Sequence, residues 1–282
     1  MKRWEFTGGT KLHCGITLRR IRATMDFTLK CGLKVLKGEN GGWIEKERNL
    51  SGDAWASDNA LVYDNARVYD DAWVSGDARV YENAMVYGDA CVNNNARVYG
   101  NAQVYDTAIV FGSAHIYGNA WVSGYARISG DARVYDDGWV LGHAFVNGYA
   151  RVFGNAQVYC DACVFGEAQV YDNAKVCGSA RVFGNACIFG NARVFGSACI
   201  SRDAKVQKLG DVIWFENIWS SGRVFTYTKS NNKWDVGCFY GTGEELIKKA
   251  YKDSELSGKC YEATVKYVEQ IYAAIDASKE AN

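Results

Sequence analysis

The chain has few residues of the kinds that usually carry catalysis. It holds three histidines and ten cysteines, and these side chains serve enzymes as general bases, nucleophiles or metal ligands. Cys160 and Cys163 have the spacing of a metal-binding pair, but no second pair follows them. We therefore expect reduced thiols and no metal site.

The histidines occupy positions that do not favour catalysis. His13 lies near the start of the chain, whereas His115 and His143 fall at variable positions of a repeat. A general base needs a pocket that brings it within reach of a substrate. We therefore expect ordinary surface histidines, no catalytic residue, no cofactor and no enzymatic activity.

Arginine and tyrosine recur at a fixed spacing of 18 residues. Stacked cations repel one another until an anion arrives, and guanidinium groups bind carboxylates and phosphates. Arginine and aromatic rings are also enriched at protein interfaces. We predict a partner-binding surface for an acidic protein, with nucleic acid as the second choice of partner. Its residues are Arg79, Arg97, Arg133, Arg151, Tyr81, Tyr99, Tyr117 and Tyr135.

A six-residue repeat must position these columns. Alanine returns at every sixth position from Ala54 to Ala204, except at Gly138, and a Val or Ile follows two residues later, except at Ala56. The pair before each alanine is rich in Gly, Asn, Asp and Ser, which favour turns. Each unit is therefore a short strand and a turn, and three units close a triangular coil.

The pattern resembles the hexapeptide-repeat family, in which an aliphatic residue is followed four places later by a small one, as in Val62 to Ala66. This resemblance implies a left-handed parallel β-helix, here of about eight coils. Many members are trimeric acyltransferases with a histidine base beside a loop that interrupts the coils, and this array has no such loop. The lead-in Gly41-Gly42-Trp43-Ile44-Glu45 resembles hexapeptide-repeat proteins of bacteriophages and prophages.

The chain divides into three segments. The repeat predicts a mainly β fold, and the segments on either side of it are expected to cap its two ends. Residues 1–50 carry eleven basic and five acidic side chains and are expected to form a small β-rich N-terminal cap, and residues 51–206 are the β-helix. Residues 207–282 are expected to form a C-terminal α+β domain. Its expected strands are Asp211–Ile218, Arg223–Lys229 and Trp234–Tyr240, and its helices begin at Thr242 and near Gly258.

One face of the array places two indoles on neighbouring coils. Because exposing such a surface to water is unfavourable, we expect a homo-oligomer with Trp121, Trp139 and Leu141 at the contact. Gly138, beside this contact, lacks the methyl group that fills the inner corner elsewhere. Replacement of Gly138 by alanine is therefore expected to be neutral or stabilising.

The formal net charge is zero, and no apolar run approaches the length of a membrane span. We therefore expect a cytoplasmic protein of a bacterial host that does not bind membranes. The favoured function is a non-enzymatic binding or scaffold protein, a phage accessory or anti-defence inhibitor that occupies a host protein. The alternatives are an acyltransferase-like enzyme with its active site between subunits, and a structural virion or polymer-forming protein.

Overall fold

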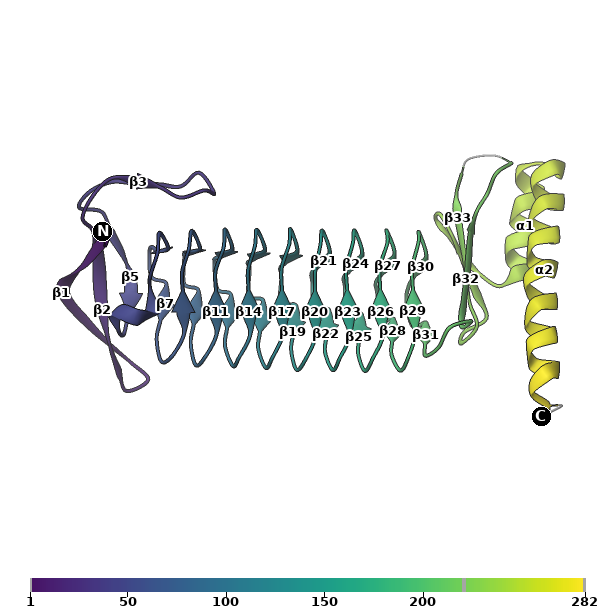
Figure 1. Ribbon diagram of the computed structural model, residues 1–282. Helices are drawn as coiled ribbons and strands as arrows, with labels where there is room; N and C mark the ends of the chain where they lie inside the picture. Colours follow the sequence, from purple (N-terminus) through teal and green to yellow (C-terminus); the bar gives the residue numbers. More distant parts are fainter. Residues whose placement is uncertain (1, 220–221, 281–282) are drawn as a thin grey trace.

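The computed structural model describes residues 2–219 and 222–280 and is a long rod with a different structure at each end (Figure 1). The rod is a parallel β-solenoid, as the repeat predicts. Between Trp55 and Val206, where every residue is described, twenty-six two-residue strands follow one another without an excursion. Three strands make each turn, so the rod has almost nine turns, slightly more than expected.

The three flat sides of the rod are named here by the residues they present. The Arg–Tyr face consists of β7 (Leu61–Val62), β10 (Arg79–Val80), β13 (Arg97–Val98), β16 (His115–Ile116), β19 (Arg133–Val134), β22 (Arg151–Val152), β25 (Gln169–Val170), β28 (Cys187–Ile188) and β31 (Lys205–Val206). The Trp face consists of β8 (Arg67–Val68), β11 (Met85–Val86), β14 (Gln103–Val104), β17 (Trp121–Val122), β20 (Trp139–Val140), β23 (Gln157–Val158), β26 (Lys175–Val176) and β29 (Arg193–Val194). The third face consists of β6 (Trp55–Ala56), β9 (Trp73–Val74), β12 (Cys91–Val92), β15 (Ile109–Val110), β18 (Arg127–Ile128), β21 (Phe145–Val146), β24 (Cys163–Val164), β27 (Arg181–Val182) and β30 (Cys199–Ile200).

The interior of the rod is filled by the repeated aliphatic residue and the repeated alanine. Both positions are fully buried in the middle of the array, as Val134 and Ala132 illustrate, whereas Arg133 between them is exposed. This is the inward and outward alternation expected of a strand. Neighbouring coils bind through backbone hydrogen bonds, such as the Arg133 N–H to the Ala150 carbonyl at 2.9 Å.

The corners depend on a backbone conformation that favours glycine. The residue two places before each alanine has a positive φ, at Gly in many turns and at Asp, Glu or Asn in most of the others. Cys160 (φ 59°) and Arg202 (φ 57°) adopt it as well, although it costs such residues about 1 kcal/mol or more. Carboxylates at this corner also accept backbone hydrogen bonds from the next coil, as Glu82 does from the Gly100 N–H at 2.8 Å.

Gly138 departs from the expectation for its position. Its φ is not positive, yet a Cβ there would lie 2.9 Å from the carbonyl oxygen of Val152 and 3.0 Å from that of Tyr135. Both neighbours are backbone atoms, so the turn would have to move. Against the expectation from the sequence, this geometry predicts that Gly138→Ala is destabilising, because an added Cβ would press on two backbone carbonyls.

The N-terminal segment continues the Arg–Tyr face beyond the first repeat. β1 (Trp4–His13) and β2 (Ile16–Ala23) form an antiparallel hairpin, and β2 pairs with β5 (Asn40–Ile44). β5 in turn pairs in parallel with β7, so the coil structure begins inside the segment expected to be a separate cap. The 3₁₀ helix η1 (Glu47–Asn49) then leads into the array.

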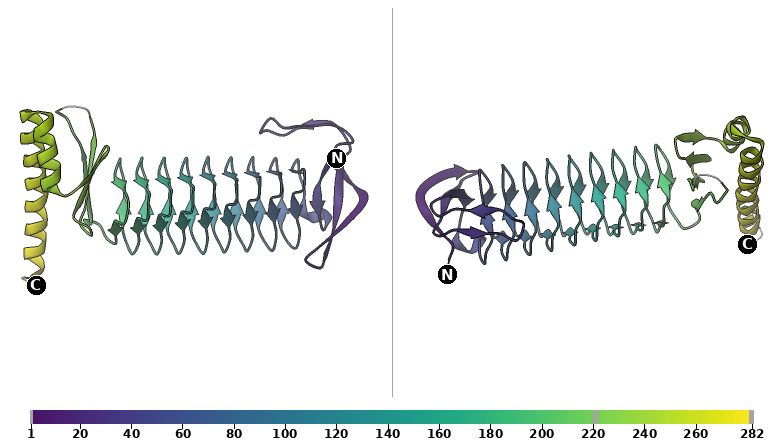
Figure 2. Two further views of the ribbon diagram at one scale, coloured as in Figure 1. Left: turned by 180° about the vertical axis from the view of Figure 1, so that it is seen from behind. Right: turned by 90° about the horizontal axis from the view of Figure 1, so that it is seen from above.

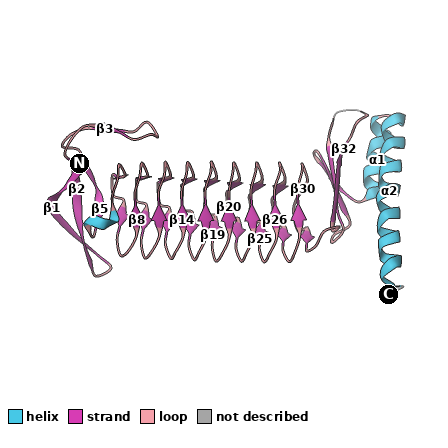
Figure 3. Ribbon diagram, viewed as in Figure 1, coloured by secondary structure: helices cyan, strands magenta, loops and turns pink. Residues whose placement is uncertain are grey.

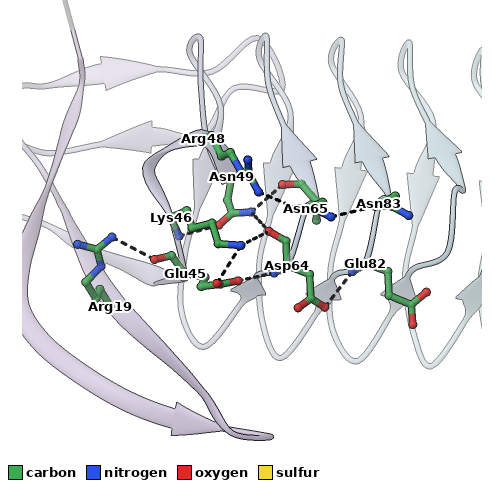
Figure 4. A network of polar contacts seen from close by, with 10 residues as sticks. Arg19, Glu45, Lys46, Arg48, Asn49, Asp64, Asn65, Glu82 and Asn83 are labelled. Atoms are coloured by element: carbon green, nitrogen blue, oxygen red, sulfur yellow. Dashed lines mark hydrogen bonds and ion pairs between the residues drawn. The ribbon is translucent and has the colours of Figure 1, made fainter.

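Polar side chains fasten this first turn to the repeats (Figure 4). The Asn49 amide donates to the carbonyls of Asp64 at 3.2 Å and Ala66 at 2.8 Å. Glu45 accepts the Asp64 N–H at 2.7 Å, and Arg48 donates to the side chain of Asn65 at 2.7 Å. Backbone groups that an open coil end would leave unpaired are thus satisfied.

A short hairpin arm extends from the same segment along the rod (Figures 1 and 2). It is formed by β3 (Phe27–Thr28) and β4 (Lys34–Val35). Leu29 and Val35 are buried in the core, and Lys30 forms ion pairs of 3.2 Å with Asp71 and with Asp89. The arm therefore covers the beginning of the third face.

The C-terminal segment is an antiparallel sheet covered by two helices at the far end of the rod (Figure 3). Its strands are β32 (Val212–Glu216), β33 (Val224–Thr228), β34 (Lys233–Val236) and β35 (Phe239–Gly241). The expected strand Trp234–Tyr240 is thus two strands, because Gly237 adopts φ 62° and turns the chain. The other two expected strands are present as β32 and β33.

The first helix begins where the sequence predicts, and the second begins earlier than predicted. α1 (Gly243–Asp253) begins after Thr242, with the predicted capping box to Glu245. α2 (Glu255–Glu280) begins three residues before the predicted start at Gly258. None of the described helices has the length and apolar character needed to cross a membrane.

Candidate interaction surfaces

The arginines predicted to bind a partner lie in one column on the Arg–Tyr face. Arg79 is in register with Arg97, and Arg133 with Arg151, on strands that are neighbours in the sheet. His115 occupies the coil between the two pairs. Arg133 and Arg151 are exposed, whereas Arg79 and Arg97 are partly covered. The structure therefore brings the predicted cations together on one surface.

The predicted tyrosines form a continuous stack beside these cations. The ring centroids of Tyr81 and Tyr99 lie 4.9 Å apart, and those of Tyr117 and Tyr135 are also separated by 4.9 Å, with planes within 4° of parallel in both pairs. The stack continues without a gap from Tyr63 to Phe189. Such pairs stabilise a sheet by roughly 0.2–1 kcal/mol each, so the stack is both a structural element and a flat aromatic surface.

Positive charges on this face act on the one histidine of the column. Partial burial and the positive charges of Arg97 and Arg133 lower the pKa of His115 below its ordinary value of 6.5. Burial raises the pKa of Tyr99 to about 12, so its hydroxyl stays neutral and can donate hydrogen bonds. The column therefore combines cations with neutral donors at neutral pH.

The N-terminal hairpin covers the beginning of the Arg–Tyr face. Tyr63, the first ring of the stack, is only 7% exposed because Leu18 and the ring of His13 pack around it. His13 contacts this ring edge-on at a centroid distance of 5.4 Å. The open part of the aromatic surface therefore begins near Tyr81, and the hairpin forms a wall at its end.

The residues predicted for self-association form a second aromatic site on the Trp face. The indoles of Trp121 and Trp139 are stacked at 5.2 Å with planes 4° apart. They line a shallow groove together with Asn119, Asp137, Asn155 and Gln157. Both indoles and Leu141 are half-buried, so the array itself covers part of this apolar surface.

A ladder of asparagines runs along the corner between these two faces, and the sequence analysis overlooked it. The side-chain amide of Asn83 donates to the amide oxygen of Asn101 at 3.2 Å, and Asn101 donates to Asn119 at 3.0 Å. Asn119 donates in turn to Asp137 at 3.0 Å, and a carboxylate cannot pass the donation on. The ladder resumes beyond this break, from Asn155 to Asn173 at 3.3 Å.

The other candidate residues are not brought into one site. His143 stacks on Tyr125 at 4.8 Å at an exposed corner, away from His115. All ten cysteines are free thiols. Within residues 2–219 and 222–280, no group of three or more His, Cys, Asp or Glu side chains could hold a metal ion.

Comparison with known proteins agrees with the solenoid architecture. Two stretches of the array, residues 60–76 and 126–142, match the family model of the YdcK β-solenoid repeat. Each stretch is about one coil long. No curated protein matches the chain. The repeat match and the structure thus agree on a β-solenoid repeat fold.

Proposed function

We propose that the protein is a non-enzymatic binding protein whose Arg–Tyr face binds an acidic surface of another protein. The observation that carries the proposal is the arginine column beside an unbroken aromatic stack. Neighbouring strands in a sheet lie about 4.8 Å apart, so the charges repel in the free protein and a carboxylate relieves that repulsion. The solenoid backbone is already ordered before binding, so only the side chains of this face lose conformational freedom when a partner binds.

The proposal favours a protein over nucleic acid as the partner. Acidic residues occupy both corners that border the Arg–Tyr face, for example Asp77 and Asp64, and they would oppose a phosphate backbone. The lead-in resemblance to phage proteins extends the proposal to a phage accessory or anti-defence factor in a bacterial cytoplasm that inhibits a host protein. The proposal also includes self-association of the protein through Trp121 and Trp139.

Charge reversal on one face tests the proposal directly. Arg97→Glu with Arg133→Glu should abolish capture of a partner from bacterial lysate, measured by quantitative mass spectrometry of the bound proteins. The matched control is Arg127→Glu with Arg181→Glu on the third face, which makes the same change in net charge at exposed arginines. Equal loss in both variants, or capture unchanged in the first, contradicts the proposal.

The remaining parts need separate measurements. Sedimentation of the wild-type protein should give an oligomer that Trp121→Ser with Trp139→Ser dissociates, and a wild-type monomer at high micromolar concentration contradicts self-association. Transfer of an acetyl group from acetyl-CoA to any acceptor, lost in His115→Ala with His143→Ala, would favour the enzymatic alternative instead.

A further inference from the structure

An open, polar hollow lies between the N-terminal hairpin and the beginning of the Arg–Tyr face. Its volume is about 410 Å³. β1 contributes Lys11 and His13 to one side, and β10 contributes Arg79 to the other. The corner before the face supplies Asn59, Asp77 and Asn95, which follow one another on three successive coils, and Leu61 completes the lining.

The lining combines the groups that bind oxyanions. Lys11 and Arg79 carry positive charge, and the two asparagines bring amide N–H donors to the same hollow. His13 is held in place because its ring packs on Tyr63 at 5.4 Å. Burial and the charges of Arg79 and Lys11 lower the pKa of His13, so both cations are close enough to act on this ring.

We propose that this hollow is an oxyanion-binding site, for the carboxylates of an acidic polypeptide or for a free sulfate or phosphate. The inference rests on the proposed function for the first of these sources, since an acidic partner on the Arg–Tyr face would reach the hollow at its end. Asp77 is the single carboxylate in the lining. Its negative charge lowers the affinity for an anion, so that removing this one charge should raise the affinity.

The site should bind more tightly as the pH falls from 8 to 6. Protonated His13 adds a third positive charge, and the bound anion stabilises that form. Asp77 shares the hollow with His13, and the other titratable or charged groups around the ring are Lys11, Arg79, Tyr63 and the Cys14 thiol, whose Sγ lies 3.7 Å from Nε2. Burial raises the pKa of Tyr63 to about 12, so this phenol does not titrate in that range.

An NMR titration of the full chain with inorganic sulfate tests the site, because the charge of sulfate is constant across this pH range. The ring signals of His13 should shift saturably and its pKa should rise. His115, between Arg97 and Arg133 on the same face but outside the hollow, is the internal comparison. It should shift only at higher sulfate concentrations, because Lys11 and the two asparagines of the hollow are absent there. Equal responses of the two rings mean general attraction to the arginine column, and no response of His13 means no site; either result overturns the inference.

Three variants sharpen the test. Arg79→Gln should weaken sulfate binding by about tenfold or more, as expected for one charge-assisted hydrogen bond, and Asp77→Asn should tighten it by about threefold. Arg151→Gln, in the same column but outside the hollow, should leave it unchanged. If Arg79→Gln and Arg151→Gln weaken binding equally while both melt like the wild type, the assignment of the hollow is wrong.

A second titration with hexaglutamate distinguishes the sources. Displacement of sulfate by the peptide assigns the site to carboxylates of a polypeptide, whereas sulfate binding without peptide binding assigns it to a free oxyanion. The Arg97→Glu and Arg133→Glu variant should still bind sulfate at His13. If that variant still captured a partner, the proposed function would fail, and this result would not depend on whether the hollow binds sulfate.

Discussion

The solenoid and the C-terminal module, residues 212–280, build their cores in different ways. In the solenoid one continuous core runs from Trp4 to Val206, and each coil repeats the contacts of the previous one. In the module a separate core gathers Phe225, Trp234 and Leu246 between one sheet and two helices. A stack of repeats derives its stability from contacts between neighbours, whereas the module depends on contacts that occur once.

The junction between them is made by side chains rather than by strand pairing. β32 to β35 form a sheet of their own. Thr226 accepts the Cys199 N–H at 2.9 Å, and Ser201 donates to Asp235 at 2.6 Å. The N-terminal hairpin, in contrast, extends the Arg–Tyr sheet through backbone hydrogen bonds. The N-terminal end is therefore part of the solenoid, whereas the C-terminal module is a distinct unit.

The largest expected effect comes from emptying the core of the module. Phe225 is fully buried, so Phe225→Ala should cost about 3–5 kcal/mol. Differential scanning calorimetry should show the module melting earlier while the solenoid transition stays in place. A single transition that shifts as a whole would break the comparison, because the two regions would then unfold together.

A smaller loss is expected inside the solenoid. Val134→Ala should cost about 1–3 kcal/mol through the cavity that it leaves, and Arg133→Ala, on the outward side of the same strand, less than about 1 kcal/mol. Chemical denaturation followed by tyrosine fluorescence measures both. Equal costs would contradict the inward and outward assignment of the two positions.

Gly138→Ala should cost about 1 kcal/mol, because the added methyl group presses on the carbonyl of Val152. Ala132→Gly, one unit earlier, is the matched reverse change and should also destabilise the rod, by about 0.5–1 kcal/mol. The measurement is the solenoid melting temperature of each variant. A gain in stability for Gly138→Ala would restore the expectation drawn from the sequence alone.

The smallest effect is a pH dependence confined to the solenoid. The folded chain holds the pKa of His115 below 6.5, so the unfolded chain binds more protons in that window. Stability should therefore fall as the pH drops from 6.5 through the folded pKa. His115→Gln should flatten this slope for the solenoid transition and leave the module unchanged. A slope identical to that of the wild type would show that His115 is not its source.

The array was predictable because every position repeats its environment. The six-residue period determined which side of each strand is buried. The columns of Arg and Tyr followed because residues 18 apart lie on the same face. The asparagine ladder was equally readable from its spacing, at Asn65, Asn83, Asn101 and Asn119, but the corner was interpreted only as a turn.

The ends were less predictable because their contacts join residues with no shared period. Nothing in the sequence around Lys30 indicates that it forms ion pairs with Asp71 and Asp89, which lie on two successive coils of the rod. The hollow at His13 was not predictable for the same reason, because it forms only when the hairpin folds close to Arg79. Its signal, Lys11 and His13 on one side of a strand, is too short to distinguish from any exposed hairpin.

The unbroken six-residue period also determines how such a rod can change in length. Removing 18 residues from the middle of the array, such as 103–120, would delete one coil, shorten the rod by about 4.8 Å and leave all three faces aligned. Removing only six residues would rotate every coil beyond the deletion by a third of a turn. The Arg–Tyr face would then be continued by strands of a different face. Within the array, a change in length therefore keeps the Arg–Tyr face continuous only when whole coils are duplicated or lost.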